Sequence, residues 1–249
     1  MKKQDVYGEF VAIANEVYAA SSADEKAIRD LQHRPHFFVL ACVMDSQIRY
    51  ERAMAIPHIV AKELGDDSFK AFADRPLEYY TNLFHAKSLH RYNDRMSRAF
   101  YLAVKRIEEQ YDSDAGRIWS DTPSSAELVS RFLEFDLVGI KIATMAANVL
   151  ARDFKTPLKD KYSIDISPDV HIKRVFYRMG LLPLSEGASF SEMDSTKVIY
   201  KAREINPEFP GILDLLCWQI GEQRICTNGI CRCGECKLNS ICEKKGLEK

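Results

Sequence analysis

Five cysteines are crowded into the last 24 residues of this 249-residue chain, and four of them are spaced like the ligands of a metal centre. These four follow the pattern C-x6-C-x2-C-x5-C, at Cys226, Cys233, Cys236 and Cys242. One compact loop can therefore bring four thiolates to a single centre. Structural zinc and a [4Fe–4S] cluster both accept four thiolates, and ligand count does not choose between them. Disulfides are a third reading, poorly suited to the reducing compartment that we expect for a sequence with no secretion signal.

The cysteine spacing resembles the iron–sulfur loop of the endonuclease III family of DNA glycosylases. Trp218 and Gly221 precede the first cysteine, as in the family's W…G…C pattern. The resemblance implies a [4Fe–4S] cluster on the four spaced cysteines. Cys231 is an additional thiol inside the first loop, which could compete as a ligand or simply be exposed. Arg232 is the one cation in that loop, where the family has a more basic segment that grips DNA phosphate, so it is the expected phosphate contact there.

A helical hairpin is predicted near the middle of the chain. Residues 126–135 have the pattern of a helix, residues 136–139 form a short break, and a second helix is expected from Ile140 to about Asp153. The unpaired N–H groups of such a turn, with the N-terminus of the second helix, suit a DNA phosphate. Lys141 lies in the first turn of that helix, where an ammonium is disfavoured and a neutral, nucleophilic amine is favoured. Taken alone, it is an ordinary surface lysine.

The hairpin sequence Leu137-Val138-Gly139-Ile140-Lys141-Ile142-Ala143 resembles the family's G-V-G-x-K-T-A string. The resemblance implies that Lys141 is the catalytic lysine and that Val138 and Gly139 contact the DNA backbone. Asp136-Leu137 stands where the family has Pro-Gly, so the first glycine of the hairpin is missing.

Asp169 is a candidate for a second catalytic residue. It precedes a helix expected to run to about Met179 and to stop at Gly180, and an aspartate in this position caps a helix. Capping alone would explain it. The string Pro168-Asp169-Val170-His171-Ile172-Lys173-Arg174-Val175 resembles the family's V-D-T-H-I-x-R-V, whose aspartate is catalytic. Asp165 is a competing candidate that lacks the following His-Ile-x-Arg-Val.

Two further segments resemble the family's DNA-inserting elements. Val43-Met44-Asp45-Ser46-Gln47 resembles L-L-S-x-Q, which implies that Gln47 enters the duplex where the damaged base has left. Arg91-Tyr92-Asn93 resembles the L-Y-N loop that wedges the opposite strand. By themselves, these segments read as a helix terminus and a loop.

A basic helix face is expected in the segment from Leu83 to Tyr111. Met96, Phe100, Ala103 and Ile107 form an apolar face, and the cations on the opposite side are Arg91, Arg95, Arg98 and Lys105. This stripe is either a phosphate-binding surface or a plain solvated face. The chain has 35 Lys and Arg against 36 Asp and Glu, so any DNA surface must be a local basic patch.

Helical periodicity recurs along the whole chain, and the predicted fold class is all-α. The resemblance implies two lobes: a six-helix barrel with the hairpin over residues 36–154, and a lobe with the cluster formed by residues 1–35 and 155–249. It places the active site in a cleft between them, with Lys141 from one lobe and Asp169 from the other. No apolar run is long enough to span a membrane.

The resemblance implies a base-excision-repair glycosylase with abasic-site lyase activity, acting on oxidised pyrimidines in double-stranded DNA. A damaged base would leave the stack, Lys141 would attack C1′ as the base departs, and Asp169 would stabilise the positive charge on the sugar. We expect a monomer, in the cytoplasm and on nucleoid DNA. Two alternatives remain: a DNA-binding or damage-sensing protein of this fold without catalysis, and a zinc-stabilised helical protein unrelated to DNA.

Overall fold

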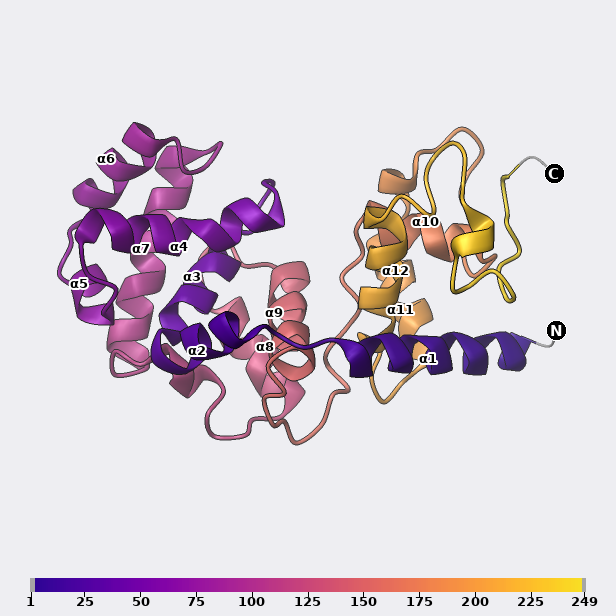
Figure 1. Ribbon diagram of the computed structural model, residues 1–249, viewed down its shortest axis with the longest axis horizontal. Coiled ribbons are helices and arrows are strands. Elements are labelled where there is room, and N and C mark those ends of the chain that lie inside the picture. Colours follow the sequence, from indigo (N-terminus) through magenta and orange to yellow (C-terminus); the bar gives the residue numbers. More distant parts are fainter. Residues whose placement is uncertain (1–2, 248–249) are drawn as a thin grey trace. The chain divides into compact units, whose positions relative to one another are not determined.

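The computed structural model describes residues 3–247, and every regular element in that range is helical (Figure 1), which confirms the all-α prediction. None of these helices is long and apolar enough to cross a membrane. Three short 3₁₀ turns lie at Ala115–Ile118 (η1), Phe190–Glu192 (η2) and Cys233–Glu235 (η3). The α-helices are α1 (Lys3–Ala20), α2 (Glu25–His33), α3 (Pro35–Met44), α4 (Tyr50–Leu64), α5 (Phe69–Ala73), α6 (Leu77–Lys87), α7 (Asn93–Gln110), α8 (Ser125–Leu133), α9 (Ile140–Arg152), α10 (Val170–Arg178), α11 (Ser195–Ile205) and α12 (Ile212–Glu222).

The helices form two compact units, described separately below. The central unit spans residues 23–146, and the terminal unit combines residues 1–22 with 147–249. These boundaries differ from the predicted ones at 36 and 154. Helix α2 belongs to the central unit because it packs on α3. The last turns of α9 belong to the terminal unit, where the side-chain amide of Asn148 donates a hydrogen bond of 2.9 Å to the carbonyl of Gly211.

Helix α3 is the centre of the central unit. Pro35 occupies its first turn, where a missing N–H costs nothing. Eight of its ten residues are buried, which is the pattern of a helix enclosed on all sides. It packs against α2, α4 and α7. This burial fixes the C-terminal end of α3, which is followed by Asp45 and by the candidate residue Gln47.

The predicted single helix from Leu83 to Tyr111 is wrong, because the chain leaves the helical path between α6 and α7. Ser88 adopts the left-handed conformation with φ of 48°, and this ends α6. The guanidinium of Arg52, from α4, donates to the carbonyls of Ser88 and Leu89 and so holds the break. Arg91 therefore lies in a turn ahead of α7 and not on its face. The apolar face predicted for α7 is confirmed, with all four of its members buried.

The N-terminal helix packs into the terminal unit. Phe10 of α1 meets Phe176 of α10 edge to face, with ring centroids 6.2 Å apart. Helices α10 and α12 approach so closely that a Cβ atom on Gly221 would lie 2.3 Å from the imidazole of His171. Glycine is therefore required at this crossing, which gives a structural reason for the glycine of the W…G…C pattern.

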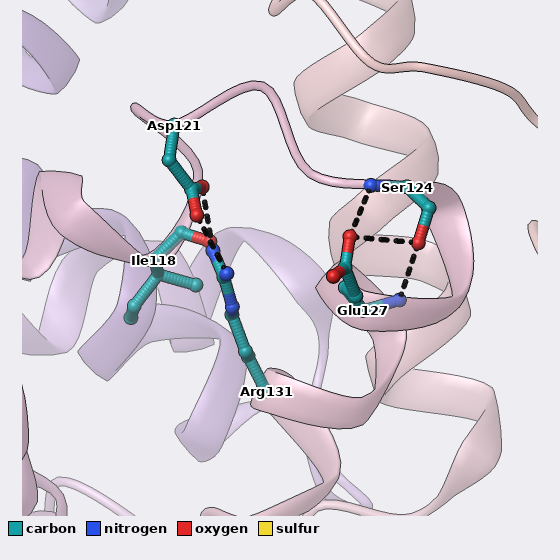
Figure 2. A network of polar contacts seen from close by, with 5 residues as sticks. All are labelled: Ile118, Asp121, Ser124, Glu127 and Arg131. Atoms are coloured by element: carbon teal, nitrogen blue, oxygen red, sulfur yellow. Dashed lines mark hydrogen bonds and ion pairs between the residues drawn. The ribbon is translucent and has the colours of Figure 1, made fainter.

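Two sets of polar contacts hold α8, the first helix of the hairpin, in place (Figure 2). Ser124 and Glu127 form a capping box, in which each side chain accepts from the other residue's backbone N–H, at 3.2 Å and 2.7 Å. On the same helix, Arg131 forms a bidentate pair with Asp121 at 2.7 Å and donates to the carbonyl of Ile118. These contacts tie α8 to the loop before it and fix where the helix begins.

Candidate active site and cysteine cavity

The hairpin is formed as predicted, with α8 and α9 joined by a short turn. Leu137 adopts φ of 66°, the left-handed conformation that favours glycine, at the place where the family pattern has its first glycine. The turn is closed by the N–H of Val138, which donates to the carbonyl of Phe135 at 3.1 Å. Gly139 is exposed, with open space where a Cβ would lie. Leu137 therefore adopts, with backbone strain, a conformation that glycine would adopt freely.

Replacing Leu137 with glycine should relieve this strain. A non-glycine residue in the left-handed region is disfavoured by about 1 kcal/mol. We expect Leu137→Gly to be more stable than Leu137→Ala by about 1 kcal/mol, or about 2–4 °C in melting temperature. Both variants lose the leucine side chain, so their difference isolates the backbone conformation. Equal melting temperatures for the two variants would show that the turn carries no such strain.

Lys141 is exposed in the first turn of α9, and a carboxylate lies near it in the central unit. Asp45 follows α3 directly, and its N–H donates to the carbonyl of Cys42. Burial raises the pKa of Asp45, and the positive charge of Lys141 partly offsets this effect. A carboxyl group with a raised pKa is a better proton acceptor for an amine beside it. Sequence reasoning missed Asp45, although it occupies the serine position of the L-L-S-x-Q pattern.

The structure brings the two candidate DNA-inserting segments together. Gln47 is exposed, with φ of 57°, and its side-chain carbonyl accepts a hydrogen bond of 3.0 Å from the Tyr92 hydroxyl. The guanidinium of Arg91 lies over the Tyr92 ring, 4.9 Å from its centroid. Asn93 holds the loop in place by accepting from the N–H of His90 at 3.0 Å. Gln47 and Tyr92 therefore form one exposed polar element on the central unit.

The predicted cap of α10 is confirmed, because the Asp169 carboxylate accepts a hydrogen bond of 2.8 Å from the N–H of Ile172. A second carboxylate lies close to it in the terminal unit. Asp214, on α12, accepts a 2.7 Å bond from the N–H of Ser167. Burial raises the pKa of Asp214 to about 6, with a further contribution from the charge of Asp169. The competing candidate Asp165 is buried in a bidentate ion pair with Arg203, at 2.7 and 2.8 Å, which gives it a structural role.

The buried carboxyl of Asp214 should make stability depend on pH. Because its pKa is higher in the folded chain than the usual value near 4, the folded state holds this proton more tightly. The stabilisation that the protonated Asp214 carboxyl gives to the folded state is present below about pH 4, and it is lost as pH rises through about 6. We expect Asp214→Asn to be more stable than the wild type at pH 7.5, by about 3 kcal/mol, and this gain to shrink at pH 4.5.

Urea unfolding at the two pH values measures the effect of Asp214→Asn. Glu204→Gln is a control for which the change in pH dependence of stability should have the opposite sign. The side chains of Lys201 and Lys3 lower the pKa of Glu204 to about 2, so its contribution is present at neutral pH and is lost on acidification. If Asp214→Asn and the wild type showed the same pH dependence, Asp214 would not be the buried acid described above.

All five C-terminal cysteines line one cavity of the terminal unit, together with Arg178. Nε of Arg178 is buried and, within the described part of the chain, has no hydrogen-bond partner. An N–H group without an acceptor at the cavity wall can donate a hydrogen bond to the sulfurs of an anionic cluster. Among residues 3–247, no three His, Cys, Asp or Glu side chains come together tightly enough for a single metal ion. The five thiols line one space, and four thiolates are a ligand set that both structural zinc and an iron–sulfur cluster accept.

Two of the predicted cationic contacts are engaged within the protein. Arg232 pairs with Glu235 at 2.7 Å and donates to the carbonyl of Gln223 at 2.6 Å. Lys105 pairs with Glu108 at 2.6 Å. Arg95 and Arg98 are exposed on α7 and remain candidate phosphate contacts.

The architecture places the chain among all-α proteins built of two helical units with a helical hairpin, and solved structures define the fold further. No family model matches the sequence, and no match is found among curated proteins. A trapped covalent intermediate of endonuclease III with DNA, an estranged-adenine complex, is similar with a TM-score of 0.60 and 16% identity, covering 98% of both chains. A non-covalent endonuclease III–DNA complex gives a TM-score of 0.61 at 17% identity, also over 98% of both chains. The chain has an endonuclease III-like fold.

Proposed function

We propose that this protein is a DNA glycosylase with abasic-site lyase activity, acting on double-stranded DNA that carries a damaged base. The observation that carries the proposal is Lys141, an exposed lysine in the first turn of the second hairpin helix. The likeness to endonuclease III bound to DNA supports it. In our proposal, Lys141 is the nucleophile and Asp169 is the second catalytic residue, as the family strings imply.

The chemistry assigned to each residue follows from its type and position. The amine of Lys141 attacks C1′ of the sugar, the bond to the base breaks, and the resulting imine permits elimination of the 3′ phosphate. The Asp169 carboxylate stabilises positive charge developing on the sugar. Asp45 lies near Lys141 and can accept its proton before attack. Gln47 fills the space left by the extruded base and offsets part of the cost of unstacking.

We further propose that Cys226, Cys233, Cys236 and Cys242 hold a [4Fe–4S] cluster. The support is the shared cavity of the thiols and the orphaned N–H of Arg178 at its wall. When bound, such a cluster cross-links the C-terminal loop and so stabilises the terminal unit. Anaerobically purified protein should be yellow-brown and contain iron. Zinc in place of iron would contradict this part of the proposal.

The substrate class can be tested with duplexes that each carry one lesion or a bare abasic site. Under single-turnover conditions we expect release of oxidised pyrimidine bases and strand cleavage at the abasic site. Undamaged duplex is the control. If no lesion is excised and the abasic site is not cut, the catalytic proposal is wrong, and a non-catalytic DNA-binding role takes its place.

A further inference from the structure

The cysteine cavity contains one thiol more than a cluster needs. Its five thiols belong to Cys226, Cys231, Cys233, Cys236 and Cys242, whereas a [4Fe–4S] cluster takes four. The other two cysteines, Cys42 and Cys217, are buried and do not line this cavity. Cys231, which lies outside the four-cysteine spacing, shares the space with the expected ligands.

Cys231 lines the same cavity as the four expected ligands. Cys226 and Cys231 are five residues apart in the chain, and the Cys231 thiol acts electrostatically on the thiols of both Cys226 and Cys236. Cys231 therefore faces the same space as the expected ligands.

The loop that joins Cys226 to Cys231 brings its two ends together. The N–H of Arg232 donates to the carbonyl of Ile225 at 2.8 Å and closes the base of the loop. Ile230, near the tip, is 92% exposed, and a Cβ on Gly229 would meet nothing within 4 Å. A loop with a closed base and an unpacked tip can change its local conformation without disturbing the core.

The Cys231 sulfur is held by backbone contacts that a ligand can keep or give up. The N–H of Thr227 donates to it at 3.3 Å. The thiol itself donates to the carbonyl of Thr227 at a sulfur–oxygen distance of 3.4 Å. A thiol is a weak donor, so this second bond does little to oppose recruitment of the sulfur to iron.

We propose that Cys231 is an alternative fourth ligand of the cluster and replaces Cys226, while Cys233, Cys236 and Cys242 stay bound. The inference rests on the proposed function, which places the cluster in this cavity. In the exchange, the iron–sulfur bond to Cys226 breaks and Cys226 takes up a proton. Cys231 loses its proton and forms the new bond. No electron is transferred, and no further reactant is needed.

Four variants test the proposal by their iron and sulfide content, visible absorption and electron paramagnetic resonance after anaerobic purification. Cys226→Ser and Cys231→Ser should each keep most of the wild-type iron. The double variant should lose iron to the level of Cys233→Ser, which removes a ligand that has no replacement. Loss of iron in Cys226→Ser to the level of Cys233→Ser would overturn the proposal. Absence of iron from the wild type would instead reject the cluster itself.

Alkylation of the intact wild-type protein gives a second measurement that needs no variant. Each iron-loaded chain should carry one label in this cavity, on Cys226 in some molecules and on Cys231 in others, as located by peptide mass spectrometry. The buried thiols of Cys42 and Cys217 are protected by the fold and serve as internal controls. Labelling of Cys231 alone, with Cys226 always protected, would show a fixed ligand set and overturn the proposal.

Discussion

Lys141→Gln protein should form no borohydride-trapped complex with damaged or abasic DNA and should lose strand cleavage at abasic sites. Glutamine removes the nucleophilic amine and adds no charge. The side chain is exposed in the first turn of α9, so the fold and its melting temperature should be unchanged. Affinity for duplex DNA should change little, because one cation is lost from the whole contact surface.

Lys26→Gln is a matched control for this prediction. Lys26 is the second residue of α2 and is exposed, as Lys141 is the second residue of α9. The control variant should trap DNA as the wild type does. Trapping by Lys141→Gln protein at the wild-type rate would mean that another amine is the nucleophile.

Asp169→Asn should slow base removal by about a hundredfold to a thousandfold. A single well-placed group in a closed site contributes about 3–4 kcal/mol to lowering the barrier, and the substitution removes its charge. Asparagine caps helices about as well as aspartate, so α10 should keep its N-terminus. Single-turnover kinetics on the best lesion substrate measure the effect.

Asp194→Asn separates the catalytic role of Asp169 from its capping role. Asp194 caps α11 and accepts from the N–H of Thr196 at 2.8 Å, so both substitutions replace a capping aspartate in the same unit. The control should leave base removal unchanged. If the two variants had equal rates, Asp169 would be a helix cap and nothing more.

The parts of the structure that depend on short stretches of sequence could be predicted. The cap at Asp169 and the stop at Gly180 are set by residues within a few positions of each helix end. For the same reason, the predicted ends of the two hairpin helices agree with the observed ends to within two residues. The apolar face of α7 follows directly from its periodicity.

The parts that depend on distant residues could not be predicted. The break after α6 occurs at Ser88, which carries no glycine or proline signal, and it is held by Arg52 from another helix. Leu137 keeps a glycine-like backbone that its residue type does not favour. Asp45 and Lys141 interact electrostatically although they are far apart in the sequence, and spacing along the chain gives no sign of this interaction.

The most direct test of the catalytic proposal is to identify the residue that becomes attached to DNA. Wild-type protein is incubated with a duplex containing an abasic site, reduced with borohydride and digested, and the peptide that carries the sugar remnant is sequenced by mass spectrometry. We predict one modified peptide, with the remnant on Nζ of Lys141. A remnant on another lysine or on the terminal amine, or no adduct at all, would contradict the proposal.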